Sequence, residues 1–379
     1  MTIYADYAAT TPLCPRARAA MLDCMENLYG NPSSLHTPGR QAKDRLEEAR
    51  EAIAACLGAE PREIYFTSGG TEADNWAISA GASLGNRTGK RRIVTTAMEH
   101  HAVLRPVERQ RESGFQVTLL EPGRDGRILP ESLQAALEED AALVSVMYVN
   151  NEVGTVQPIA ELGALCRSAG VLFHSDAVQA VGHIPVNVER DKVDMLSLSA
   201  HKFGGPRGVG ALYVRQGVPL EPLLIGGAQE RGFRAGTENL PAIVGMQAAL
   251  EEAIAKLEEN ARWVCALRQR LVEGLAAIPD SIIPGDMEHS APGILNVCFS
   301  GIRGESLLLL LDRAGVCASG GAACTSGALE PSHVLLSMGI PAEQAKGALR
   351  LSLGPENTEE EVESIIRTVT ETVHYLRNL

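Results

Sequence analysis

Short apolar runs along the chain alternate with segments in which apolar residues recur every three to four positions. The short runs predict strands at 63–68, 91–97, 115–121, 143–150, 171–176 and 193–200. The periodic segments predict helices at 71–84, 130–140 and 158–170. They also predict one helix that follows the strand at 91–97 and ends at about Arg111. This alternation is typical of an α/β fold with a mostly parallel sheet and covering helices.

A longer periodic segment follows at about 239–277, and we expect it to be one helix that bridges two domains. Fewer elements follow it: strands at 294–300 and 348–354, and helices at 304–315 and from about Thr358. This composition predicts a smaller α+β domain. We place the large domain at 16–256 and the small domain at 1–15 together with 257–379.

Composition and charge exclude several classes of protein. The net charge of −13 disfavours a nucleic-acid partner. No window approaches 18 consecutive apolar residues, and the N-terminal stretch has no basic region of a signal peptide, so we expect no membrane association and a cytoplasmic protein. The eight cysteines are scattered without CxxC spacing, which argues against a disulfide framework and against a zinc site.

Polar groups gather where the predicted strands end. They are Ser68–Thr71, His100, Asn150, Asn151, Asp176 and Lys202. In a parallel α/β sheet, ligands bind outside the carboxyl ends of the strands. Lys202 also stands before a glycine-rich turn in "SAHKFGGPRGVG", which keeps the nearby backbone bare. We infer that this lysine is presented to a ligand.

These groups together match the requirements of pyridoxal 5′-phosphate. The turn "SGGTE" at 68–72 offers backbone amides and a hydroxyl at a helix start, which suits a phosphate, although a plain helix cap has the same pattern. Asp176 is a carboxylate for a pyridine nitrogen, and Lys202 is an amine for a Schiff base. No spacing of His100, His101, His174 and Asp176 is typical of a metal site, so we expect none in this pocket and treat a metal hydrolase as a poor alternative.

The motifs extend over essentially the whole chain. They are "YADYAATTP", "GNPSSLHTPGR", "FTSGGTEADN", "EHHAVL", "VNNEVGTVQP", "HSDAVQAVG", "SAHKFGGPRGVGALYV", "RGFRAGTEN", "GAACTSG" and "LRLSLG". In this order they resemble the cysteine desulfurases of the NifS/IscS type, within the class V aminotransferase group. The resemblance implies a homodimeric, fold-type I pyridoxal-phosphate enzyme with a large domain, which has a mostly parallel seven-stranded sheet, and a small domain.

The resemblance also implies roles by position. Lys202 would form the Schiff base with the cofactor, His100 would stack on its ring and move protons, Asp176 would pair with the ring nitrogen, and Gln179 would contact the phenolic oxygen. The implied phosphate ligands are Gly70, Thr71, Ser199 and His201, with Thr237 reaching the phosphate of the other subunit. The implied ligands of the substrate carboxylate are Asn31, Asn151 and Arg350.

Cys324 lies among small residues in "CASGGAACTSGA" at 317–328, where the backbone bends easily. Most cysteines are buried small hydrophobes, and we assign no chemistry to the other seven. The resemblance implies that Cys324, on a loop at about 317–330, takes sulfur from L-cysteine as a persulfide and leaves L-alanine. His100 is then a candidate acceptor for the thiol proton, and an acceptor protein such as an iron–sulfur scaffold would receive the sulfur.

Two departures and several alternatives stay open. Residues 319–324 are Ser-Gly-Gly-Ala-Ala-Cys, so two hydroxyls present in many relatives are absent. The sequence ends at Leu379, whereas some relatives have a longer C-terminal tail that helps dock a scaffold, so we expect scaffold docking to differ or to be weak. The alternatives are a selenocysteine lyase, another class V aminotransferase, and a non-catalytic protein that retains the fold. The sequence alone does not name the acceptor.

Overall fold

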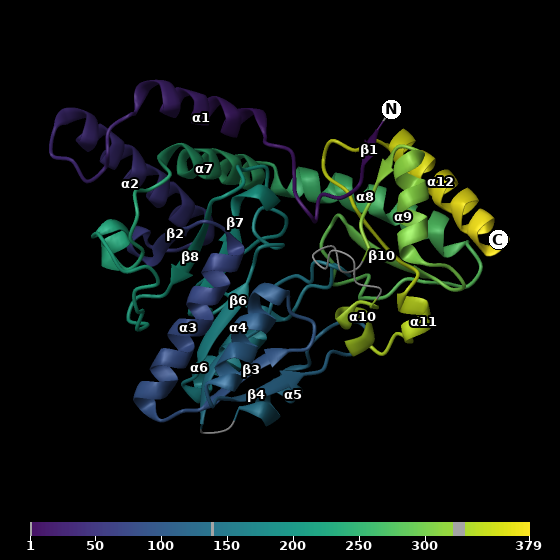
Figure 1. Ribbon diagram of the computed structural model, residues 1–379, viewed down its shortest axis with the longest axis horizontal. Coiled ribbons are helices and arrows are strands. Elements are labelled where there is room, and N and C mark those ends of the chain that lie inside the picture. Colours follow the sequence, from purple (N-terminus) through teal and green to yellow (C-terminus); the bar gives the residue numbers. More distant parts are fainter. Residues whose placement is uncertain (1, 138–139, 321–329) are drawn as a thin grey trace.

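The computed structural model describes residues 2–137, 140–320 and 330–379. Cys324 therefore lies outside the described residues. Within them the chain forms a large sheet covered by helices and a smaller group of strands and helices beside it (Figure 1).

The large sheet has seven strands in the order β2-β8-β7-β6-β5-β3-β4. Their bounds are β2 Ile64–Thr67, β3 Arg92–Thr96, β4 Gln116–Leu120, β5 Ala141–Ser145, β6 Leu172–Asp176, β7 Met195–Ser199 and β8 Gly210–Val214. The pairs from β4 through β7 are parallel, whereas β8 is antiparallel to both β7 and β2. The predicted fold class, with a mostly parallel seven-stranded sheet, is confirmed.

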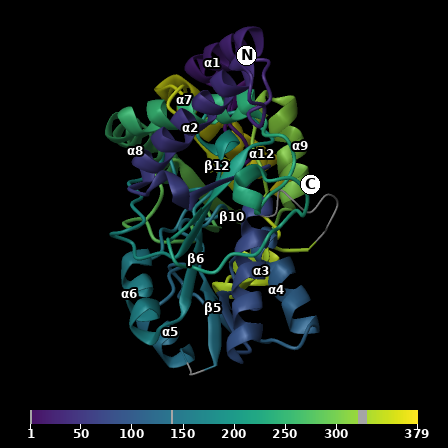
Figure 2. The same cartoon turned by 90° about the vertical axis from the view of Figure 1, so that its left-hand side faces the viewer.

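Helices cover both faces of this sheet. Figure 2 shows α5 (Pro130–Ala136) and α6 (Ile159–Ala169) on one side, and α3 (Gly70–Thr88) and α4 (His101–Glu112) on the other. At one end of the sheet, α1 (Pro15–Asn27) and α2 (Thr37–Leu57) pack against α7 (Leu240–Ala255). These parallel strands are buried on both faces, which explains their nearly continuous apolar runs.

The smaller group contains an antiparallel sheet with the order β12-β10-β9 and the short parallel pair β1-β11. Its strands are β1 Ile3–Tyr4, β9 Ser281–Ile282, β10 Ile294–Phe299, β11 Val316–Cys317 and β12 Ala348–Ser352. Its helices are α8 Leu257–Ala276, α9 Gly304–Arg313, α10 His333–Ser337, α11 Ala342–Ala345 and α12 Glu359–Arg377. The final helix begins at a capping box formed by Thr358 and Glu361, a local signal that fixes its start.

The hydrophobic core falls into separate clusters that follow this division. The largest cluster draws on residues from Ala8 to Leu250 together with Ala291 and Ile294, and another joins Ile3 and Ala5 to residues from Val264 to Val373. We therefore retain, as a proposal, the division into a large domain at 16–256 and a small domain at 1–15 and 257–379.

Three element predictions need correction. The helix expected at 239–277 is two helices, because the chain turns at Lys256 between α7 and α8. The strand expected at 143–150 ends at Ser145, and the following residues bend so that Met147 and Val149 line a cavity. The helix expected at 130–140 ends at Ala136.

Candidate active site

The carboxyl ends of the central strands open into a cavity of about 300 Å³. The predicted site residues that line it are Gly70, Thr71, His100, Asn151, Asp176, Gln179, Ser199, His201, Lys202 and Arg350. Strand register explains part of this convergence. Because Asp176 on β6 lies opposite Ser197 on β7, the chain beyond β7 carries Ser199 and Lys202 over the same edge of the sheet.

Lys202 ends a single 3-10 turn directly after β7 and is half-buried at the cavity. Its Nζ donates hydrogen bonds to the carbonyl oxygens of Ala8, at 2.6 Å, and Ala9, at 2.9 Å. The side-chain amide of Gln179 donates to the same Ala8 oxygen at 2.7 Å. The N-terminal segment therefore holds the lysine and the glutamine at one point of the cavity wall.

The start of α3 forms one end of the cavity. The first backbone N–H groups of a helix have no hydrogen-bond partners within the helix and lie at the positive end of its dipole, so they are suited to bind a phosphate. A Cβ on Gly70 would lie 2.6 Å from Val178 Cγ2, so the close approach of this side chain to the helix start favours glycine. Thr71, Ser199 and His201 lie around this helix start, and burial lowers the pKa of His201 to about 4.

Carboxyl groups line the inner wall of the cavity. Asp176 is buried and its Oδ1 accepts the Val178 amide at 2.9 Å. Burial raises the pKa of Asp176, whereas the nearby charge of Lys202 lowers it. Asp74 and Glu99, which the sequence analysis did not single out, are also buried there, and burial raises the pKa of Glu99 to about 8.

His100 is the N-cap of α4, and its Nδ1 accepts the Ala102 amide at 3.1 Å. Burial, with the charges of Lys202 and His333, lowers the pKa of His100, so the ring is neutral at neutral pH. A neutral imidazole has one acceptor nitrogen, and the Ala102 amide occupies it, so the ring proton lies on Nε2. In this arrangement the Nε2–H of His100 is a hydrogen-bond donor, and the expected role of His100 as an acceptor of the thiol proton stays a prediction.

The small group of strands contributes Arg350, which is 2% exposed. Its Nη1 donates to the carbonyl oxygen of Asn151 at 3.0 Å and its Nη2 to Asp6 Oδ1 at 2.9 Å. Asn151 and Arg350 thus meet across the cavity from different parts of the chain. The planar guanidinium of Arg350, which lines the cavity, is suited to bind a carboxylate.

Asn31 and Thr237 do not reach this cavity. Both are exposed, and Asn31 Oδ1 accepts the Ser33 amide at 2.9 Å. Their roles, like that of Cys324 outside the described residues, stay predictions.

Comparison with known proteins bears on this arrangement. The family model described as "Aminotransferase class-V" matches residues 3–365. The chain belongs to the class-V aminotransferase family. A curated relative, "Cysteine desulfurase IscS" from Methanosarcina thermophila, is 48% identical over 377 residues, which cover 100% of this chain and 93% of that protein. "Cysteine desulfurase" from Trichormus azollae is 47% identical, with 100% of this chain and 94% of that protein covered.

A solved structure, "NIFS-LIKE PROTEIN", superposes with a TM-score of 0.93 at 41% identity, covering 99% of this chain and 100% of that one. The predicted resemblance to the NifS/IscS type is confirmed. Within residues 2–137, 140–320 and 330–379, no helix is both long and apolar enough for a membrane span. In the same described part, no three His, Cys, Asp or Glu side chains are arranged to hold a metal ion.

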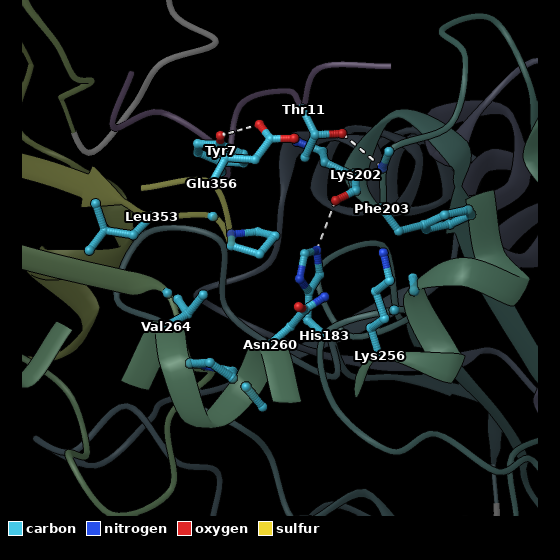
Figure 3. A pocket seen from close by; sticks show the side chains of 18 of the residues that line it. Tyr7, Thr11, His183, Lys202, Phe203, Lys256, Asn260, Val264, Leu353 and Glu356 are labelled. Carbon is cyan, nitrogen blue, oxygen red and sulfur yellow. Dashed lines mark hydrogen bonds between the residues drawn. The ribbon is translucent and has the colours of Figure 1, made fainter. Parts of the chain in front are cut away.

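A second cavity of about 300 Å³ lies behind Lys202, between α8 and the large sheet's loops (Figure 3). The His183 ring faces the backbone of Lys202, and its Nε2 lies 2.8 Å from the Lys202 carbonyl oxygen. Tyr7 and Glu356 lie at another part of the cavity wall, where the Tyr7 hydroxyl donates a 3.0 Å hydrogen bond to Glu356 Oε2. The segment that carries the lysine is thus supported on its far side as well.

The signals for the residues that the sequence analysis missed were weak. Glu99 and Glu152 stand inside the motifs "EHHAVL" and "VNNEVGTVQP", but an acidic residue beside a histidine or an asparagine has no distinctive spacing. Only the fold shows that both are buried at the cavity.

Proposed function

We propose that this chain is a pyridoxal-phosphate-dependent cysteine desulfurase, which converts L-cysteine to L-alanine and transfers the sulfur to Cys324. The observation that supports this most is the position of Lys202, in one cavity with a bare helix start and a buried carboxylate. The relatives named as cysteine desulfurases over the full chain support the choice of reaction.

The cavity has the donor set that the cofactor requires. The start of α3 with Thr71, Ser199 and His201 would hold the phosphate, Asp176 would hold the ring nitrogen, and Gln179 the phenolic oxygen. When bound, the cofactor would supply an electron sink for the bonding electrons released at the substrate Cα, while the Lys202 amine is free to act as a base. Gly70 has no side chain, so its backbone N–H at the start of α3 is open to a phosphate.

The chain's own groups then perform the proton and binding steps. Arg350 and Asn151 would bind the substrate carboxylate and so orient the Cα proton toward Lys202 Nζ, which takes it. Asp176 in its ionised form would keep the ring nitrogen protonated, helped by the field of Lys202. His100, with its proton on Nε2, would donate a proton during release of the product.

Sulfur transfer requires a thiolate, because the thiolate is the nucleophile in attack on sulfur. We propose Cys324 for this role, on a loop at about 317–330 of which residues 321–329 lie outside the described part. The nearest described cysteine in sequence, Cys317, is only partly buried and lies on β11.

The test follows sulfur on the protein itself. After addition of L-cysteine, mass spectrometry is expected to find one additional sulfur atom on the peptide that contains Cys324. The Cys324→Ser variant is expected to lose the added sulfur and sulfide release, whereas Cys317→Ser is expected to keep both. A Cys324→Ser variant that still releases sulfide from L-cysteine would refute the proposed nucleophile, and turnover with an amino acceptor alone would favour an aminotransferase.

We also propose that two copies of this chain form the enzyme. Exposed apolar side chains support this proposal: Leu22, Met25, Tyr29, Leu35, Leu224 and Ile225, of which Leu35 is 89% and Ile225 94% exposed. The α1–α2 connection and the 217–237 segment lie on the same side of the molecule, at the left in Figure 1. Exposed Thr237 in the latter segment would then reach the partner's cavity.

Ile225→Asp is expected to shift the protein from dimer to monomer, because it places a carboxylate in an apolar interface. Light scattering after size-exclusion chromatography measures the mass. Leu309→Asp is the matched control, since Leu309 is 67% exposed on α9, in the small group of strands and helices. A dimer that persists in Ile225→Asp would place the interface elsewhere.

An acceptor protein such as an iron–sulfur scaffold is the proposed destination of the sulfur, and the cytoplasm the proposed compartment. In support of the latter, the described cysteines are all free thiols, as is usual under reducing conditions.

A further inference from the structure

Arg350 is flanked by acidic groups before any substrate arrives. Asp6 Oδ1 accepts from Arg350 Nη2 at 2.9 Å, and the Asp6 side chain is 18% exposed. Glu152 follows Asn151 directly, lines the same cavity and is 3% exposed. Glu152 interacts electrostatically with Arg350. With both acids ionised, one guanidinium faces two carboxylates.

Glu152 is also tied to the small group of strands and helices. Its Oε2 accepts a hydrogen bond from Ser332 Oγ at 2.5 Å, and Ser332 is the N-cap of α10. The backbone of Glu152 is fixed as well, since its amide donates to Asn150 Oδ1 at 2.8 Å. The carboxyl group therefore has a hydrogen-bond partner inside the protein and is shielded from water.

A substrate carboxylate would bring a third negative charge to this cluster. Inside a protein, where the dielectric response is weak, an uncompensated like charge is costly. One of the acids can lower this cost by binding a proton. Asp6 has a direct ion pair with Arg350 and is 18% exposed, whereas Glu152 is 3% exposed and has no ion pair among the described residues.

We propose that Glu152 is a positioning residue that binds a proton when the substrate carboxylate binds to Arg350, so that substrate affinity depends on the protonation of Glu152. The inference rests on the proposed function, because it takes Arg350 as the carboxylate ligand. No bond other than O–H changes: the proton comes from solvent and goes to a Glu152 oxygen.

The charge environment of Glu152 supports the proposal. Burial raises the pKa of Glu152 to about 7, while the Ser332 hydrogen bond and the charge of Arg350 lower it. Among the described residues, the other titratable groups around this cavity are Asp6, Asp74, Glu99, His100, His101, Asp176, His201, Lys202, His333 and Arg350, and Cys298 lies near Glu152. Below pH 7 Glu152 is mostly protonated and the site accepts a carboxylate. Above pH 7 the ionised acid must first bind a proton, so affinity falls as pH rises.

The test compares binding of two ligands to the cofactor-loaded protein. L-alanine carries the carboxylate, and L-alaninamide carries a neutral amide in its place. Calorimetry at pH 6, 7 and 8 gives the affinities, and repeating it in two buffers of different ionisation enthalpy gives the number of protons taken up. The variants are Glu152→Gln, which is permanently neutral, and Glu161→Gln, an exposed control at the start of α6.

At pH 8 about one tenth of Glu152 is protonated, so Glu152→Gln is expected to bind L-alanine about tenfold more tightly than the unaltered protein. At pH 6 Glu152→Gln and the unaltered protein are expected to bind L-alanine with nearly equal affinity. On binding L-alanine at pH 8, the unaltered protein and Glu161→Gln are each expected to take up nearly one proton more than Glu152→Gln does, because the proton that the ligand amine releases is common to all three. L-alaninamide is expected to show no difference between the variants.

A second variant keeps the inference testable if Glu152→Gln is unstable. Ser332→Ala removes a hydrogen bond that favours the ionised acid, so the pH at which L-alanine binding weakens is expected to move upward. The same pH dependence in the unaltered protein, Glu152→Gln and Ser332→Ala would overturn this inference alone. Equal binding of L-alanine and L-alaninamide at every pH would overturn the assignment of Arg350 and the inference with it.

Discussion

Replacing Lys202 by alanine is expected to lower kcat/KM for sulfide release from L-cysteine by at least about 10³-fold. The variant loses the amine that binds the cofactor covalently and the base that takes the Cα proton. Neither neighbouring histidine replaces it, because His201 has a pKa lowered to about 4 and the His100 acceptor nitrogen is occupied by the Ala102 amide. Sulfide is measured at neutral pH with added pyridoxal phosphate.

A second measurement separates binding from chemistry. Borohydride treatment is expected to attach the cofactor permanently to the peptide that contains Lys202 in the unaltered protein, and to attach none there in the alanine variant. Lys202→Arg keeps a cation that can donate to the Ala8 oxygen but offers no amine, so it is expected to lose activity equally.

Lys256→Ala is the matched lysine control. Lys256 lines the second cavity and pairs with Glu252 at 2.7 Å, so its loss is expected to leave turnover within about twofold. A Lys202→Ala variant with a tenth or more of the original activity would refute the assignment.

Sequence patterns were sufficient for the parts of the site that depend on chain order. The alternation of strands and helices places strand ends at one edge, so Asp176, Ser199 and Lys202 were expected together, and the structure brings them to one cavity. Arg350 is different, because it lies on a strand of the small sheet far along the chain. Only the resemblance of its motif predicts a role for Arg350 at the site, because no apolar periodicity indicates that it lies beside Asn151.

Other features depend on contacts that no local pattern specifies. Glu152 is buried where it contacts Ser332, 180 positions away in sequence, and this burial raises its pKa. The break at Lys256 was missed because the apolar spacing continues through α7 and α8, although each helix packs against a different group of elements. Strand β8 was not predicted as an element, since its residues stand in the glycine-rich motif after Lys202.

A buried ion pair supports strand β2, which leads to the turn proposed to bind the cofactor phosphate. Arg50 on α2 donates two hydrogen bonds of 2.8 Å to Glu230, and their side chains are 4% and 2% exposed. Glu230 Oε2 also accepts the Phe66 amide of β2 at 2.9 Å, and Arg50 Nη1 donates to the Ile64 carbonyl oxygen at 2.9 Å. The pair thus joins α2, the edge strand β2 and the 229–232 turn.

Arg50→Met is expected to reduce the free energy of unfolding by about 3–5 kcal/mol, because it leaves the Glu230 carboxylate buried without a cation. Urea unfolding followed by circular dichroism measures the change, in the presence of saturating cofactor. The surface pair of Arg111 and Glu108, with side chains 45% and 48% exposed, is the matched control. Arg111→Met is expected to change stability by less than about 1 kcal/mol.

The double variant Arg50→Met/Glu230→Gln distinguishes an unpaired charge from a packing defect. If the cost of Arg50→Met comes from the stranded carboxylate, neutralising Glu230 should restore a large part of the lost stability, and the two changes should be strongly non-additive. A neutral amide at position 230 still offers an oxygen to the Phe66 amide, so the edge strand keeps that hydrogen bond. Additive losses in the double variant would instead attribute the cost to the cavity left by the guanidinium, and would contradict the electrostatic explanation.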